Sequence, residues 1–136
     1  MCQNTRYLVT SKPVATYACH CTDCQTRTGS AFGLSMIIST DDVKLTHGVT
    51  ETWTRVVQGG QKFLWERCPN FGTNLMATIE GAPEITAIWP GTLDDSSWVE
   101  PKAHFWTKSA QRWVMFRDSD VVYDEQPDDF SVLFGL

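Results

Sequence analysis

Three cysteines within six residues constrain this chain more than any other feature of its sequence. Cys19, Cys21 and Cys24 lie close together, whereas Cys2 and Cys68 stand apart. The chain has five cysteines, an odd number that cannot pair completely into disulfides, and cysteines two residues apart rarely reach the geometry of a disulfide. In a reducing compartment such a cluster indicates metal binding or redox chemistry rather than a disulfide framework.

The spacing of the three clustered cysteines suits a single metal ion. In an extended strand, Cys19 and Cys21 point to one face and Cys24 points to the other. A turn at Thr22-Asp23 corrects this and lets the three sulfurs converge at the zinc–sulfur distance of about 2.3 Å. Thiolates prefer soft or borderline metals, of which Zn²⁺ is the commonest at such sites. Three protein ligands leave a fourth tetrahedral position for water or substrate, which is typical of a catalytic zinc.

Two other interpretations of the cluster remain open. A fourth protein ligand closes the site into a structural one, and four side chains are candidates for it: His20, His47, His104 and Cys68. We expect His20 to point away, because it lies between two ligands. A redox role is the second interpretation, but the sequence lacks the βαβ pattern that accompanies such Cys-x-x-Cys motifs.

The charge of the expected site indicates its chemistry. Three thiolates outweigh the charge of Zn²⁺ and leave the site net negative, so it is a weak Lewis acid that holds a further soft ligand well. A thiol bound to zinc is deprotonated. The expected substrate is therefore a small thiol, held as a thiolate that adds to carbon or leaves from it.

Composition narrows the class of protein. The 136 residues suffice for one domain, and 42% hydrophobic with 20% charged residues is the composition of a soluble globular protein. No apolar run approaches the ~18 residues of a membrane helix, and residues 1–15 contain no apolar core of a signal peptide. We therefore expect a cytoplasmic protein without a membrane partner.

Acidic residues are concentrated at the end of the chain. Six of the 16 follow Arg117, where no basic residue occurs, and the rest of the chain is nearly neutral. We expect residues 118–136 to form a solvated acidic tail or edge of the single domain 1–136. The sequence lacks the basic pattern of a nucleic-acid-binding protein, so no nucleic acid is expected as a partner.

Strand-like stretches dominate the sequence. β-Branched and aromatic residues fill 50–57 and 62–68 on either side of Gly59-Gly60, which predicts a hairpin. Residues 102–126 fit either a helix or strands around a turn, and periodicity alone does not decide between them. The expected fold class is all-β, with one or two helical turns. Further strands are expected at 35–39, 74–79, 84–89 and 113–116.

The cysteine motif and the residues after it resemble a known family. Cys19-His20-Cys21-x-x-Cys24, followed by Thr28-Gly29-Ser30-Ala31-Phe32, resembles the signature of the glutathione-dependent formaldehyde-activating (GFA) family, which includes the centromere protein V type of domain. The likeness extends over most of the chain, from residue 2 to about residue 115. It includes five further blocks in family order: Arg6-Tyr7, 68–75, 91–95, 101–106 and Trp113.

The resemblance implies a fold, an activity and a metal site. The fold would be an all-β, zinc-containing β-tent. The activity would join glutathione to formaldehyde to give S-hydroxymethylglutathione, which in the reverse sense is the reaction of a carbon–sulfur lyase. Cys19, Cys21 and Cys24, which match the family's motif, would hold the catalytic zinc.

The sequence departs from the family at a second, structural zinc site. The family holds that ion with four cysteines, a Cys-x-Cys near the start and a Cys-Pro-x-Cys-Gly later. Here Cys2 matches the second of the early pair, whose first member would precede Met1, and Cys68 matches the first of the later pair. Phe71 stands where its partner would be. We therefore expect one zinc per chain, Cys2 close to Cys68, and Phe71 buried in the vacated space.

Other residues give weaker signals for the site. His104 is a candidate catalytic proton shuttle, although a single histidine in a strand is more often structural. Arg27 is a candidate for binding a substrate carboxylate, with a solvated side chain as the alternative. Gly29, Ser30 and Phe32 are expected to line the substrate pocket.

Two further groups are expected to be structural. Asp94-Asp95 resembles an acid–base pair, but the surrounding Leu-Asp-Asp-Ser sequence favours turn capping. The six tryptophans are expected mostly in the core, with one or two walling a pocket.

The leading hypothesis is a zinc-dependent carbon–sulfur lyase or synthase. It acts on a small, glutathione-like thiol and an aldehyde or related electrophile, with Cys19, Cys21 and Cys24 as the metal ligands. Two alternatives stay open. One is a re-tasked zinc lyase or isomerase acting on a larger metabolite, and the other is a non-catalytic binding module that zinc stabilises.

Overall fold

A computed structural model describes residues 3–56 and 60–134 of the chain. Within these residues, one α-helix and ten strands confirm the expected mainly-β class. The helix is α1 (Thr22–Thr28). The strands are β1 (Arg6–Val9), β2 (Ala15–Cys19), β3 (Gly33–Ser39), β4 (Val43–His47), β5 (Glu51–Val56), β6 (Lys62–Arg67), β7 (Asn74–Ile79), β8 (Ala82–Ile88), β9 (Ala103–Phe105) and β10 (Val121–Val122). Short 3₁₀ helices span Thr40–Asp42, Pro90–Thr92, Thr107–Ser109 and Phe130–Leu133.

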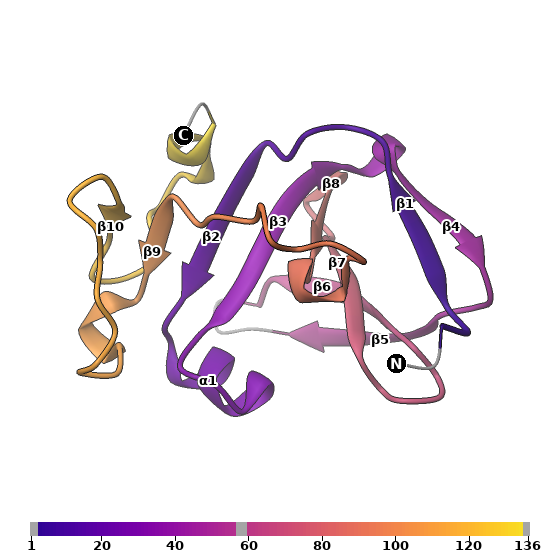
Figure 1. The fold of residues 1–136 in the computed structure, drawn as a ribbon, viewed down its shortest axis with the longest axis horizontal. Helices are drawn as coiled ribbons and strands as arrows, with labels where there is room; N and C mark the ends of the chain where they lie inside the picture. Colours follow the sequence, from indigo (N-terminus) through magenta and orange to yellow (C-terminus); the bar gives the residue numbers. More distant parts are fainter. Residues whose placement is uncertain (1–2, 57–59, 135–136) are drawn as a thin grey trace.

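Eight of the strands form one sheet in the order β10-β9-β2-β3-β8-β7-β6-β5, and β1 pairs with β4 in a separate two-stranded sheet. Neighbouring strands are antiparallel except for β2 with β9 and β9 with β10, which are parallel. Figure 1 shows β9 and β10 at one end of the molecule, β1 and β4 at the other, and α1 below β2 and β3. The helix follows β2 directly, so the cysteine motif lies where a strand passes into a helix.

Side-chain alternation gives the large sheet two buried faces. One face packs against β1 and β4 and is formed by Met36, Ile38, Cys68, Leu75, Met76 and Ile88. The other face is formed by Ala15, Ile37, Ala103, Phe105 and Leu133, with Tyr17 and Cys19 packed against them. The register places Trp53, Trp65, Ala77, Ala87 and Ile37 in one row across this second face. Cys19 and a row containing two tryptophans therefore share one side of the sheet.

Most of the expected strands are present. β5 and β6 pair as the predicted hairpin, with Trp53 opposite Trp65, although Gly59 of the expected turn lies outside the described residues. β7 has the predicted bounds, β3 includes the expected stretch 35–39, and β8 covers the expected stretch 84–89 except for Trp89. The strand expected at 113–116 is wrong, because these residues form a turn and loop in which Trp113 and Met115 are exposed. Their apolar side chains therefore belong to no sheet.

The stretch 102–126 forms no α-helix. It contributes β9, the 3₁₀ helix Thr107–Ser109 and β10, so the strand interpretation is the better one. The acidic end of the chain lies at the β10 edge of the large sheet, and beyond it Leu133 is only 1% exposed in the second core. This segment is thus packed into the domain at its edge.

The expectation that Phe71 is buried is wrong. Phe71 is 63% exposed, at the tip of the β6–β7 turn. The turn is closed by its backbone, since Cys68 N donates to Thr73 O over 2.9 Å and Gly72 N donates to Cys68 O over 2.8 Å. Cys68 is buried in the first core, whereas Cys2 lies outside the described residues, so their expected proximity stays a prediction.

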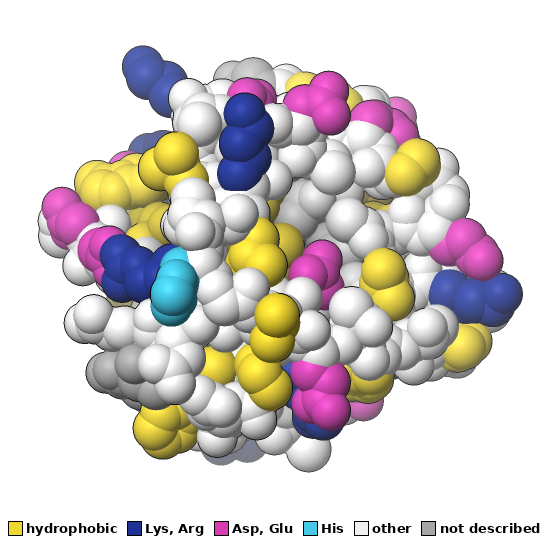
Figure 2. All heavy atoms as spheres, turned by 90° about the vertical axis from the view of Figure 1, so that its right-hand side faces the viewer, with side chains coloured by type: hydrophobic (Ala, Val, Ile, Leu, Met, Phe, Trp, Pro, Cys, Tyr) yellow, Lys and Arg dark blue, Asp and Glu magenta, His cyan; other side chains and the backbone are white. Residues whose placement is uncertain are grey.

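The end of the molecule formed by β1 and β4 is shown in Figure 2. Basic, acidic and hydrophobic side chains are interspersed on this face, and the described side chains form no continuous area of one charge sign there. Within the described residues, no helix combines the length and apolar character needed to cross a membrane.

Candidate functional site

The three clustered cysteines converge where β2 passes into α1. Cys19 ends β2, Cys21 is the N-cap of the helix, and Cys24 lies within it. The Cys24 backbone N–H donates to the Cys21 sulfur over 3.3 Å, so the thiol itself satisfies one of the free donors at the helix start. The predicted turn is therefore the first turn of a helix. As expected, it brings the three sulfurs together, within 4.8 Å of one another.

The Cys24 thiol is the most acidic of the metal-free cluster. A hydrogen bond from Cys19, with a smaller effect of the Arg27 guanidinium, lowers the pKa of Cys24 to about 5 despite its burial. The same hydrogen bond raises the pKa of Cys19, and burial raises the pKa of Cys21. A metal that binds all three sulfurs therefore displaces protons, so its affinity rises with pH.

No fourth ligand joins the cluster within the described residues. His20 is fully buried and points away from the sulfurs, as expected, with its Nε2 3.0 Å from His104 Nδ1. His47 is exposed on β4, and Cys68 lies in the core on the other face of the sheet. Soft thiols in threefold arrangement fit a zinc ion with one position left for another ligand.

A buried polar chain leads away from the metal cluster. His104 on β9 contacts His20 through Nδ1, and its Nε2 is 3.3 Å from Asp120 Oδ2, an ion-pair distance without hydrogen-bond geometry. Asp120 also accepts hydrogen bonds from Arg117, and these lower its pKa against the opposing effect of its burial. Burial lowers the pKa of both histidines, so the pair is neutral at neutral pH. Both ring nitrogens of His104 thus face other side chains rather than the sulfurs, and the Phe116 ring packs 4.9 Å from it.

Arg27 lies beside the cluster. Its guanidinium carbon is 4.8 Å from the ring centroid of Trp65 and 5.1 Å from that of Trp89, and these two rings, whose centroids are 4.7 Å apart, form an aromatic wall on one side of the guanidinium. Its Nη2 donates to the Cys24 sulfur over 3.5 Å. Cys24 and Arg27 are three residues apart on one helix, which places them on the same face. The guanidinium is therefore held next to a sulfur.

Gly33 makes room for this arrangement. A Cβ at Gly33 would lie 2.7 Å from Arg27 Nη2 and 3.3 Å from the Cys24 sulfur. No real Cβ approaches another atom to 2.7 Å without something shifting. Glycine at the start of β3 is thus a requirement of the close approach of α1 to the strand.

The residues expected to line the substrate pocket lie beyond the helix. Gly29 ends α1 with a left-handed backbone, φ +61°, and Ser30 after it is exposed. Phe32 is half-buried, with its ring 5.3 Å from that of His20. Thr28 Oγ1 bridges the two ends of this turn, donating to Cys24 O over 2.8 Å and Phe32 O over 3.1 Å. The turn is thereby fixed against the metal cluster.

The tryptophans differ from the expectation that most are in the core. Trp65 is 6% exposed, but Trp53, Trp98 and Trp113 are exposed. Three of them form a row of tilted rings in contact, with ring centroids 5.2 Å apart for Trp53–Trp65 and 4.7 Å for Trp65–Trp89. This row and the neighbouring Gly33 were not predicted from the sequence, because only the pairing of the strands brings them together.

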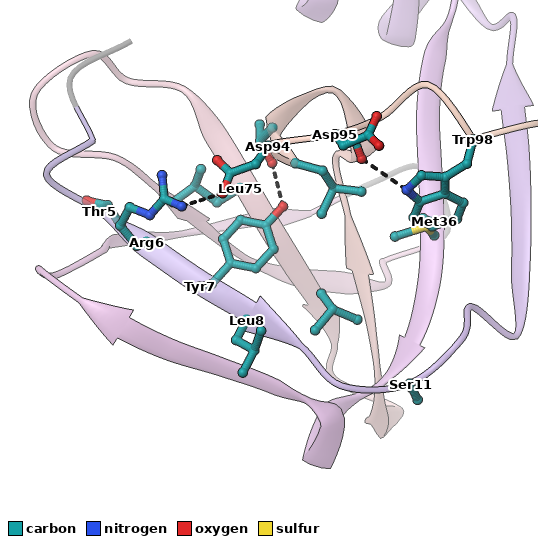
Figure 3. Close-up of a pocket in the computed structure, with 13 residues that line it drawn as sticks. Thr5, Arg6, Tyr7, Leu8, Ser11, Met36, Leu75, Asp94, Asp95 and Trp98 are labelled. Carbon is teal, nitrogen blue, oxygen red and sulfur yellow. Dashed lines mark hydrogen bonds and ion pairs between the residues drawn. The ribbon is translucent and has the colours of Figure 1, made fainter.

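A hollow of about 300 Å³ lies on the other side of the sheet from the cysteines. Figure 3 shows its polar groups paired with one another: Arg6 with Asp94, Tyr7 with Thr92, and the Trp98 indole with the backbone of Asp95. Asp95 also accepts from Ser97 N over 2.9 Å, which is the turn capping expected for this segment. These contacts account for the aspartates as structural groups.

Taken together, this is a small, mainly β protein with three cysteines at a strand-to-helix junction that could hold a metal ion. The family model for the glutathione-dependent formaldehyde-activating enzyme matches residues 1–109, so the chain belongs to the GFA family. No curated protein matches the chain. A crystal structure of a Rhodobacter sphaeroides protein is similar in fold, with a TM-score of 0.53 and 15% identity over 74% of this chain and 86% of that one.

Proposed function

We propose that this chain is a zinc-dependent carbon–sulfur lyase or synthase that joins a small, glutathione-like thiol to an aldehyde or related electrophile and also runs the reverse reaction. Membership of the GFA family supports a glutathione-dependent activity on formaldehyde. The observation that carries the proposal is the open set of three sulfurs within 4.8 Å of one another.

The cluster fits a zinc ion. Sulfurs at about 2.3 Å from a tetrahedral ion are about 3.8 Å apart, so the observed spacing needs a contraction of about 1 Å at most. The three donors are soft, as zinc and cobalt prefer. Bound zinc supplies a position at which a fourth, external thiol is held deprotonated.

The reaction at carbon is an addition. The sulfur lone pair forms a bond to the carbonyl carbon, the C=O π pair moves to oxygen, and that oxygen takes a proton from water. In reverse, the hydroxyl loses its proton, the C=O bond reforms, and the C–S pair returns to sulfur. Neither direction needs an oxidant or a reductant.

The remaining residues have supporting roles in the proposal. Gly29 and Ser30 border the approach to the cluster, and Phe32 forms an apolar wall beside them. His104 acts through His20, because its Nδ1 holds the ring of the residue between two ligands. We assign it a positioning role, and we place the protein in the cytoplasm, where thiols stay reduced.

Metal analysis and cobalt substitution test the proposal. Protein purified without added metal should hold about one zinc per chain. In the cobalt form, a titration with glutathione should change the thiolate-to-metal charge-transfer band in a saturable way. Cys21→Ser should abolish metal binding, because a hydroxyl is a poor ligand for soft metals. His47→Gln is the matched control and should leave it intact.

Two outcomes would contradict the proposal. A cobalt spectrum that glutathione leaves unchanged would indicate a closed site and a zinc-stabilised binding module. Two zinc ions per chain would show that the second site of the family is still functional. If the thiol binds but NMR shows no faster exchange between glutathione and its hydroxymethyl adduct, the site acts on another electrophile.

A further inference from the structure

Among the residues that the structure describes, no carboxylate forms an ion pair with the positively charged Arg27. Within the described residues, its only recorded polar contact is the one from Nη2 to the Cys24 sulfur. Its Nε and Nη1 are buried without hydrogen-bond partners. A buried cation is costly unless a counter-charge lies near it. The charge of Arg27 is therefore directed toward the sulfurs and not toward an acidic side chain.

The aromatic wall and Gly33 hold this charge in place. Trp65 and Trp89 pack against one side of the guanidinium, and cation–π contacts of this kind favour the flat arginine head over an ammonium group. Nη2 lies against Gly33, 2.7 Å from the position that a Cβ would take. These contacts keep Nη2 beside the Cys24 sulfur.

A cation at this place changes which ligands the metal site accepts. A divalent ion with three thiolates has a net charge of −1, and an external thiolate makes it −2. A neutral ligand leaves the charge unchanged. A fixed positive charge in direct contact with one of the sulfurs offsets the added negative charge, and its effect is strong where water is excluded.

We propose that Arg27 is a positioning residue that makes the metal site favour an anionic fourth ligand, a thiolate, over a neutral one. The inference rests on the proposed function, since it requires metal at Cys19, Cys21 and Cys24. It goes further by assigning the ligand preference to a residue that is not itself a ligand.

The test compares two ligands on the cobalt-substituted full chain. 2-Mercaptoethanol binds as a thiolate and has no carboxylate, and imidazole is neutral. Arg27→Gln removes the charge, and Arg27→Lys keeps it. Arg55→Gln is the matched control, because Arg55 lies 5.8 Å from the same Trp65 ring but pairs with Asp23 over 2.6 Å. Circular dichroism and cobalt affinity are measured for each variant.

We expect Arg27→Gln to weaken mercaptoethanol binding about tenfold or more while imidazole binding changes less than about threefold. Arg55→Gln should match the wild type for both ligands. If Arg27→Gln does not retain cobalt, Arg27→Lys carries the comparison and should keep the thiolate preference within about threefold. A role in packing alone would not separate the two ligands.

Three results would overturn the inference. The first is equal loss of both ligands in Arg27→Gln, and the second is a tenfold loss of mercaptoethanol in the charge-retaining Arg27→Lys. The third is a defect seen with glutathione but not with mercaptoethanol, which would make Arg27 a receptor for a substrate carboxylate. If the wild-type chain binds neither cobalt nor thiol, the proposed function itself fails, and this result is distinct from the other three.

Discussion

Replacing Gly33 by alanine tests how closely α1 must approach β3. The added Cβ would lie 2.7 Å from Arg27 Nη2, and 3.3 Å from both the Cβ and the sulfur of Cys24. The guanidinium is the end of a long side chain, but the aromatic wall of Trp65 and Trp89 blocks its movement on one side. The strain must therefore be relieved by moving Arg27 along this wall or α1 away from the strand.

The magnitude follows from two opposing effects. Gly33 is not among the glycines with positive φ, so alanine fits its backbone, and restricting the unfolded chain would stabilise the fold by about 0.4–1 kcal/mol. Reaching an ordinary contact of 3.4 Å from 2.7 Å requires a shift of about 0.7 Å, and overpacking of this kind costs about 1–3 kcal/mol. The expected net loss in the free energy of unfolding is about 1–2 kcal/mol.

Urea unfolding of the metal-free protein, followed by circular dichroism, measures this loss. Gly81→Ala is the control, because nothing lies within 4 Å of a Cβ there, and it should be neutral or slightly stabilising. In an Arg27→Ala background the 2.7 Å contact is gone, so the cost of Gly33→Ala should fall by about half or more. An unchanged cost in that background, or a Gly33→Ala protein as stable as Gly81→Ala, would refute the reasoning.

The remaining predictions concern residues away from the metal. Phe71→Ala should change stability by less than about 0.5 kcal/mol, whereas Leu133→Ala, at a side chain 1% exposed, should cost about 2–5 kcal/mol; urea midpoints decide both. Burial lowers the pKa of His20 and of His104, although Asp120 beside His104 has the opposite effect. The stability that the two neutral histidines contribute is therefore complete above their unfolded pKa of about 6.5, and it is lost as pH falls toward their lower folded pKa values. In metal-free protein, His104→Gln should reduce the loss of unfolding free energy between pH 7.5 and 5.5, measured by urea unfolding. An equal pH dependence of the unfolding free energy in the variant and the wild type would contradict this.

The strands that the sequence predicts are those with long or well-marked patterns. β5 and β6 are rich in aromatic and β-branched residues around a glycine turn, and β7 is apolar along its length. β9 and β10 have three and two residues, too few for a period to show. β4 is mostly exposed, so its side chains carry no burial pattern. Their positions are set by pairing with distant strands instead.

The convergence of the three cysteines was predictable because they are close in sequence. Its surroundings were not, because the pairing of β6, β7 and β8 brings Trp65 close to Trp89, and the packing of α1 on the sheet brings Arg27 to both. For Phe71 the sequence did lead to a prediction, but the prediction was wrong. A hydrophobic residue in place of a metal ligand suggested burial, but the hydrogen bonds of the turn fix its side chain toward solvent.

The cysteine cluster is anchored to both faces of the sheet by the alternation of adjacent residues. Cys19 faces the side of the tryptophan row, and His20, the next residue, faces the other side and packs against His104. The backbone makes the same link, since His20 N donates to Phe105 O over 2.8 Å. His104 in turn contacts Asp120, in the acidic end of the chain. The segment that composition marks as a solvated edge thus contacts the histidine that packs against His20, between two of the clustered cysteines.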